Sequence, residues 1–136
     1  MNRSRPWLQA LLAAEGPAPA LRLQPANAIL AHTVEVAVDS TTRRRGLLGR
    51  DQLPAGHAMV IAPCGGIHTW FMRFPIDVIF VDRSGRIVKA REHIGPFRIS
   101  LAPSAYAVVE LPAGTLATIG GAARGDTVEV VTTHVA

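Results

Sequence analysis

Short stretches in which hydrophobic and polar residues alternate recur along most of the chain. Between residues 33 and 39, Val34, Val36 and Val38 alternate with other residues, which is the period of a half-buried strand. Proline and glycine separate such runs, so we expect short strands joined by turns. The other predicted strands span 57–62, 67–74, 76–82, 86–92, 105–111 and 127–132.

The central run, from Ile67 to Asp82, reads IHTWFMRFPIDVIFVD. It predicts a strand, a bend marked by Pro75 and a second strand, which a turn at 82–85 joins to the return strand of a hairpin. In a regular first strand, one face carries His68, Trp70, Met72 and Phe74. The second strand places Ile76, Val78 and Phe80 on one face and Asp77, Ile79 and Val81 on the other.

Two or three short helices accompany the strands. Residues 2–14 carry an apolar stripe at helical spacing (Trp7, Leu8, Leu11 and Leu12), with Ser4 as the expected cap and Pro6 in the first turn. Ser40 is the expected cap of a second helix ending near Gly49, and residues 112–119 predict a third. The strands and helices do not alternate as in βαβ units, so the expected fold is mainly β (α+β). It is a small antiparallel or mixed β-barrel of about seven strands.

The chain divides into an N-terminal helix and linker, residues 1–27, and a single β domain, residues 28–136. A signal peptide is the rival interpretation of residues 1–20, because a basic start and an apolar middle precede Ala18-Pro19-Ala20. The apolar run is short and interrupted by Gln9, so we expect a cytoplasmic protein, with export as the alternative. No segment has the length of a transmembrane span.

The positive charge is concentrated in the first third of the sequence. Residues 1–50 carry seven arginines and three acidic residues, whereas residues 51–136 carry equal numbers of basic and acidic groups. A basic end attracts acidic partners, but basic and aromatic residues are not interleaved as nucleic-acid binding requires. The sequence therefore contains no specific nucleic-acid signal, and the expected partner is a small molecule or a protein. We expect a monomer. The single cysteine, Cys64, excludes an internal disulfide and a cysteine-rich metal site.

The order of these motifs resembles a prokaryotic family of unknown function, DUF192, also called UPF0127. The family block R-x-x-G-L-[ML]-x-R is matched at 43–50, and P-[LI]-D-x-[IV]-F-[IVL]-D is matched at 75–82. A block similar to L-E-[LV]-x-A-G follows at 109–114, and Gly125-Asp126 closes the pattern. The resemblance covers residues 33–131 and implies a compact, mostly β fold, but it implies no established activity.

One segment departs from the common family pattern. Many members carry W-M-K-N-T before the proline, whereas this chain resembles a branch with an I-H-T-x-F-M-R-F-P-I-D segment. A role of the Asn-Thr pair in other members therefore cannot be transferred.

Four residues are the candidates for a ligand site: Arg43, Arg50, His68 and Asp77. Asp77 lies on an apolar strand face, so its carboxylate is expected to accept hydrogen bonds from loop amides, to pair with Arg43 or Arg50, or to line a pocket. His68 is expected either in the core or in acid–base or ligand contacts. Glu110 is expected to be a buried carboxylate with a structural role.

No motif specifies a cofactor, a metal or a catalytic set. Cys64 and His68 supply two possible metal ligands, which is too few for a site, and Gly65-Gly66 and Gly120-Gly121 lack the context of a phosphate loop. We expect a small binding or accessory domain whose pocket near His68 and Asp77 takes a small polar ligand or a peptide. The alternatives are a hydrolytic or isomerising enzyme that uses these two residues, and an adaptor that docks through its basic N-terminal segment.

Overall fold

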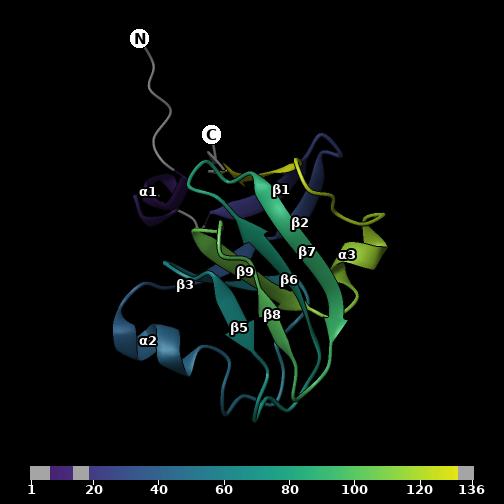
Figure 1. Ribbon diagram of the computed structural model, residues 1–136. Coiled ribbons are helices and arrows are strands. Elements are labelled where there is room, and N and C mark those ends of the chain that lie inside the picture. Colours follow the sequence, from purple (N-terminus) through teal and green to yellow (C-terminus); the bar gives the residue numbers. More distant parts are fainter. Residues whose placement is uncertain (1–6, 14–18, 132–136) are drawn as a thin grey trace.

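The computed structural model describes residues 7–13 and 19–131 (Figure 1). The residues before Trp7, which include the expected cap Ser4, Pro6, Arg3 and Arg5, lie outside the described residues. So do residues 14–18 of the possible signal peptide. The described residues form three short helices: α1 (Trp7–Leu12), α2 (Ser40–Arg45) and α3 (Thr115–Thr118). They also form ten strands: β1 (Ala20–Gln24), β2 (Ala28–Ala31), β3 (Thr33–Ala37), β4 (His57–Ile61), β5 (Gly66–His68), β6 (Ile76–Val81), β7 (Ile87–Ile94), β8 (Ile99–Leu101), β9 (Ala107–Pro112) and β10 (Thr127–Val131).

The mainly β fold is confirmed, but the expected closed barrel is wrong. The strands form a five-stranded sheet in the order β3-β4-β9-β6-β7, a three-stranded sheet in the order β10-β1-β2, and a β5-β8 ribbon. Only β3 and β4 pair in parallel. The two larger sheets stay separate along both edges. The chain leaves one sheet at β2 and enters the other at β3 after a single residue, His32. On the other side, one bridge between Arg86, which precedes β7, and Thr127 of β10 links the sheets.

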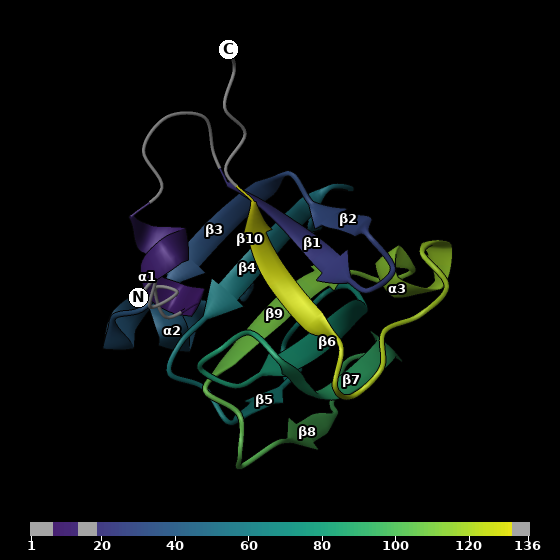
Figure 2. The same ribbon diagram turned by 90° about the horizontal axis from the view of Figure 1, so that it is seen from above.

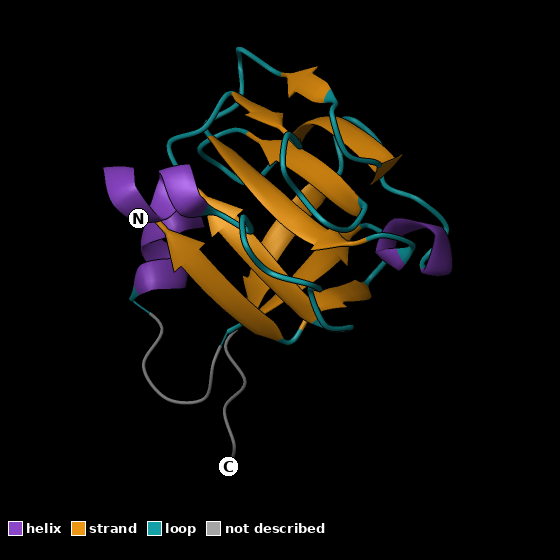
Figure 3. Ribbon diagram, turned by 90° about the horizontal axis from the view of Figure 1, so that it is seen from below, coloured by secondary structure: helices purple, strands orange, loops and turns teal. Residues whose placement is uncertain are grey.

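The five-stranded sheet is the centre of the molecule, with an apolar cluster on each face. One cluster, which includes Ile79, Val81 and Val109, packs against the three-stranded sheet, α1 and α3. The other, which includes Val78, Phe80 and Val108, lies under the α2 segment and the β5-β8 ribbon. Figure 2 shows β10 and β1 above the central strands, and Figure 3 shows that the helices lie at the periphery of the strands.

The alternation predicted for residues 76–81 is confirmed. Ile76, Val78 and Phe80 belong to one cluster and Ile79 and Val81 to the other, and all six residues of β6 are buried. Apolar surface removed from water on both faces contributes roughly 25 cal/mol per Å². The inner strand β6 therefore contributes apolar residues to the clusters on both faces of the sheet.

The strand predicted for residues 67–74 is mostly wrong. Only Gly66–His68 forms a strand, and the chain then turns, with a positive φ of 66° at Phe71. His68, Trp70 and Met72 consequently do not share a face, because Met72 is buried whereas the other two are exposed. The loop expected after residue 95 also contains a strand, β8, which pairs with β5.

The N-terminal stripe packs on the domain itself. Trp7 and Leu11 are buried in the same cluster as the first β strands, and the backbone N–H of Trp7 donates a hydrogen bond to the carbonyl of Arg83. The linker expected before residue 28 contains β1, whose Leu21 and Leu23 are fully buried. A partner that binds this stripe could not contact Trp7 or Leu11, because both side chains are buried in the domain.

Candidate functional site

Asp77 is sealed inside the protein. Its side chain is fully buried, and its two oxygens accept hydrogen bonds from the backbone N–H groups of His93 (2.8 Å) and Leu116 (2.9 Å). Backbone amides therefore satisfy Asp77 as expected, but they lie in β7 and α3 and not in loops, and neither Arg43 nor Arg50 pairs with it. A carboxylate whose oxygens are satisfied by backbone donors holds β7 and α3 in place.

The two candidate arginines have different surroundings. Arg50 forms a two-point ion pair with the exposed carboxylate of Glu35, with N–O distances of 2.6 and 3.3 Å. Arg43 donates to the carbonyls of Asp39 (3.3 Å) and Pro63 (3.2 Å) and lines a cleft. Asp39, rather than the expected Ser40, caps α2, because its carboxylate accepts a hydrogen bond from the N–H of Thr42 at 2.8 Å.

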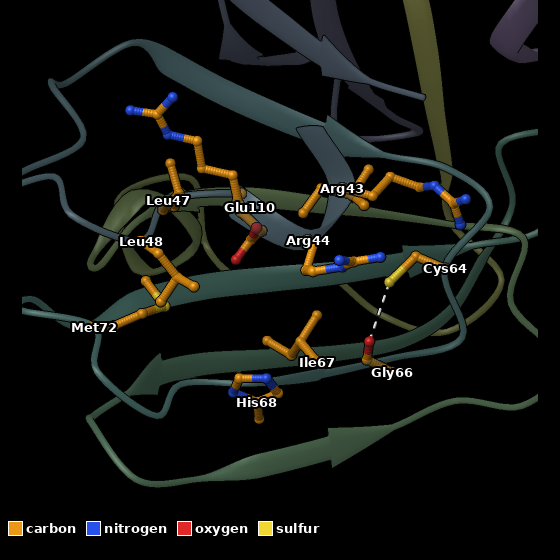
Figure 4. Close-up of a pocket in the computed structure, with 13 residues that line it drawn as sticks. Arg43, Arg44, Leu47, Leu48, Cys64, Gly66, Ile67, His68, Met72 and Glu110 are labelled. Carbon is orange, nitrogen blue, oxygen red and sulfur yellow. Dashed lines mark hydrogen bonds between the residues drawn. The ribbon is translucent and has the colours of Figure 1, made fainter. Parts of the chain in front are cut away.

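The cleft lies between the α2 segment and β5, above β4 and β9 (Figure 4). Its volume is about 190 Å³. The lining is part apolar and part charged, and Figure 4 shows these apolar side chains around a common space: Leu47, Leu48, Ile67 and Met72. Of the four predicted site residues, Arg43 and His68 line this cleft, whereas Arg50 and Asp77 do not.

Glu110 is the polar group at the bottom of the cleft. Its side chain projects from β9 on the same face as Val108, and the residue is only 4% exposed. Burial raises the pKa of its carboxyl group to about 7, and no described residue offsets this effect with a charge or a hydrogen bond. Asp77 lies on the opposite face of the same sheet, beside Leu111 of β9.

Cys64 lies beside the carboxyl group in the cleft wall. Its Sγ donates a hydrogen bond to the carbonyl of Gly66 at 3.1 Å. Burial raises the pKa of this thiol by more than its hydrogen bond to the carbonyl of Gly66 lowers it. The thiol is therefore protonated at neutral pH, which makes it a poor nucleophile.

His68 belongs to the rim of the cleft and not to the core. It is exposed, and its ring packs edge to face against Trp70, with 6.2 Å between the ring centroids. Arg44, also exposed, lines the cleft from α2. Within residues 7–13 and 19–131, no three His, Cys, Asp or Glu side chains converge as a metal site would require.

Comparison with known proteins identifies the family. The model of DUF192, described as "Uncharacterized ACR, COG1430", matches residues 21–130. The chain belongs to the DUF192 family. No curated protein matches the chain. None of the helices described is long and apolar enough to cross a membrane.

Two crystal structures share the fold of this DUF192 chain. One, from Novosphingobium aromaticivorans, is a protein of unknown function with 23% identity and a TM-score of 0.72, and the match covers 89% of this chain and 96% of that one. The other, from Sinorhizobium meliloti, is described as a "putative transcription regulator". It has 27% identity and a TM-score of 0.69, and the match covers 82% of this chain and 92% of that one.

The sequence contained a weak signal for Glu110, which is the one carboxylate in the apolar run 105–111. The local pattern predicts a second buried carboxylate with a structural role and contains no sign of the cleft. The two carboxylates differ only in what surrounds them, and the pairing of β9 with β4 and β6 sets those surroundings.

Proposed function

We propose that the DUF192 domain binds a small polar molecule in the cleft, with Glu110 as the anchor. The observation that carries the proposal is a carboxyl group that is almost fully buried, faces a cleft and has no partner among the described residues. Burial disfavours the charged form of this carboxyl group, which raises its pKa and costs stability when the group is ionised. A ligand that donates a hydrogen bond to Glu110 would remove this cost.

The lining of the cleft indicates the chemistry of the ligand. An amine or hydroxyl group suits Glu110, the apolar walls suit a short carbon skeleton, and Arg43 and Arg44 suit an anionic group at the mouth. The volume of about 190 Å³ is below the range of drug-sized pockets, roughly 300–1,000 Å³. The expected ligand is therefore no larger than an amino acid or an amino alcohol.

A ligand screen by two-dimensional NMR tests this proposal. Mixtures of amino acids, amino alcohols and small hydroxy acids are added to the labelled protein, and the amide shifts of residues around the cleft are followed. Binders should shift the signals of Gly46 and Ile67, and Glu110→Gln should weaken binding by about tenfold or more because a carboxylate partner is lost. Glu92→Gln, an exposed carboxylate on β7, is the matched control and should leave binding unchanged.

The proposal fails if the ligands found bind equally to the wild type and to Glu110→Gln. It also fails if their shifts map outside the cleft. A screen of this composition without any binder would exclude the ligand class proposed here.

Proton transfer is a second candidate activity for the same cleft. A carboxyl group with a pKa of about 7 is suited to act as a general acid or base near neutral pH. Glu110 takes the place that the sequence assigned to Asp77, whose oxygens are occupied by backbone donors. Incubation of each binder with the protein in D₂O would reveal exchange of a carbon-bound proton, and the exchange should disappear in Glu110→Gln.

A further inference from the structure

A second surface, separate from the bottom of the cleft, exposes a cluster of large apolar side chains. The cluster lies on the β5-β8 ribbon and on the two turns that flank it, which are at the lower end of the molecule in Figure 1. We call this cluster the apolar tip. Its members and their exposed fractions are Trp70 (38%), Phe71 (75%), Phe97 (60%), Ile99 (58%) and Leu101 (62%).

Thr69 ties the two turns of the apolar tip together. It is fully buried, its Oγ1 lies 2.7 Å from the carbonyl oxygen of Gly95, and the same Oγ1 accepts a hydrogen bond from the N–H of Arg98 at 2.8 Å. Its N–H donates to the carbonyl of Arg98, and its carbonyl accepts from the N–H of Phe97. Rings held in a fixed arrangement lose little conformational entropy when a partner covers them.

The two most exposed rings have an unfavourable backbone conformation. Phe71 and Phe97 have φ values of 66° and 60°, in the left-handed region where bulky residues are uncommon. Glycine or asparagine would fit these turns better. Neither ring is buried in the protein, although Phe97 packs edge to face on Trp70 with 6.1 Å between centroids. The fold thus gains little from phenylalanine at these positions, and a partner is the remaining explanation.

Basic side chains surround the apolar tip. Residues 66–74 and 89–101 carry four basic residues, Arg73, Lys89, Arg91 and Arg98, against one acidic residue, Glu92. Arg73 also pairs with Asp51, so Lys89, Arg91 and Arg98 supply the positive charge for an anionic partner. Lys89 donates a hydrogen bond to the carbonyl of Leu101 at 2.8 Å, so its charge lies at the edge of β8. Arg91 lies two residues further along β7, on the face that carries Lys89.

We propose that the apolar tip inserts into the surface of an anionic lipid bilayer. Tryptophan prefers the interface between water and lipid, and exposed phenylalanine and leucine side chains enter the boundary between headgroups and acyl chains. Basic residues near a membrane are attracted to acidic headgroups. The combination of both features on two neighbouring turns favours an anionic bilayer over an uncharged apolar partner. This proposal is independent of the ligand proposed for the cleft.

Vesicle co-sedimentation with the full chain tests the proposal. The protein is mixed with vesicles of phosphatidylcholine alone and of phosphatidylcholine with about one third phosphatidylglycerol. It should bind the anionic vesicles and show at least tenfold weaker binding to the neutral ones. The fluorescence of Trp70 should shift to shorter wavelength on binding, and Trp7→Phe should keep this shift because Trp7 is buried.

The decisive variant is the double substitution Phe71→Asn and Phe97→Asn. Asparagine tolerates the left-handed conformation, so this variant should fold while its vesicle binding falls by tenfold or more. Arg98→Gln should weaken binding to anionic vesicles about fivefold, as expected for the loss of one basic residue. Ile29→Thr removes an exposed apolar side chain from β2 and should not change binding.

Three results would overturn the proposal. The first result is a wild type that does not bind anionic vesicles. The second is a double variant that binds them as well as the wild type does. The third result is a wild-type dimer in solution that the double variant converts to a monomer, because a second copy of the chain would then cover the apolar tip.

Discussion

The carboxylate of Asp77 accepts a hydrogen bond from the backbone N–H of Leu116, a residue that follows it by 39 positions. The bond is 2.9 Å long and fully buried. It places α3 against β6, while the second oxygen of the carboxylate receives the N–H of His93 on β7. One side chain thus fixes two elements that are distant in sequence.

Replacement of Asp77 should strongly reduce stability. In Asp77→Asn, the amide nitrogen must face one of two backbone N–H donors, so one buried hydrogen bond is lost and two donors oppose each other. We expect the free energy of unfolding to fall by about 2–4 kcal/mol. Urea denaturation of the purified variant measures this change.

Asp51→Asn serves as the control for Asp77. Asp51 pairs with Arg73 on the surface, where the two side chains are 84% and 61% exposed, and we expect a loss below about 0.5 kcal/mol. Equal losses in the two variants would contradict the structural role of Asp77.

Glu110 should make stability depend on pH. The folded protein holds the proton of this carboxyl group up to a pKa of about 7, whereas the reference pKa of glutamate is 4.5. Between these two values the folded state binds more protons than the unfolded state, so the contribution of Glu110 is largest below pH 4.5 and declines as the pH rises to 7. The loss is on the order of 3 kcal/mol.

Glu110→Gln should remove this dependence because glutamine does not titrate. Urea denaturation at pH 5 and pH 8 should show a smaller difference for the variant than for the wild type, and the variant should be the more stable protein at pH 8. Identical pH profiles for the two proteins would show that the carboxyl group is not buried as described.

Thr69 should stabilise the turns of the apolar tip. Thr69→Val keeps the shape of the side chain but removes the hydroxyl, and it leaves the N–H of Arg98 without that acceptor. We expect a loss of about 1–3 kcal/mol. Faster hydrogen exchange of the amides in residues 95–98 would locate the effect.

Thr127→Val is the matched control for Thr69. Thr127 is exposed on β10, so the change should be small. If amide exchange in residues 95–98 were unaffected in Thr69→Val, the turns would not depend on this hydroxyl group.

Gly46 should control access to Glu110. Its φ of +46° and ψ of −124° form a conformation that other residues rarely adopt, and an added Cβ would lie 3.9 Å from the Glu110 Oε1 and 3.5 Å from the Ile61 Cδ1. Gly46→Ala should reduce stability by about 1–3 kcal/mol. It should also weaken binding of any ligand found in the cleft, which titration by NMR would measure.

Gly49→Ala is the control that distinguishes backbone strain from blocked access to Glu110. Gly49 has a φ of +81°, but an added Cβ would meet no atom within 4 Å. This variant should lose comparable stability and keep its affinity for the ligand. Equal losses of affinity in both variants would show that strain, and not the space above Glu110, controls binding.

Much of the fold could be predicted because side-chain alternation is local. The period-two pattern of residues 76–81 assigned Val78 and Phe80 to one cluster and Ile79 to the other, as observed. The strand predicted across Trp70 failed because the left-handed conformation of Phe71 ends it, and phenylalanine gives no sequence signal for such a turn.

The sequence by itself determined the family, the mainly β class and the hairpin of β6 and β7, because apolar spacing and turn residues act between near neighbours. Only the tertiary structure decided which carboxylate is available for binding. Asp77 and Glu110 occur in similar apolar runs, yet backbone donors from β7 and α3 reach Asp77, whereas Glu110 faces the cleft. Hydrogen-bond partners of a buried group come from segments distant in sequence, so strand pairing, and not local pattern, decides whether the group is satisfied.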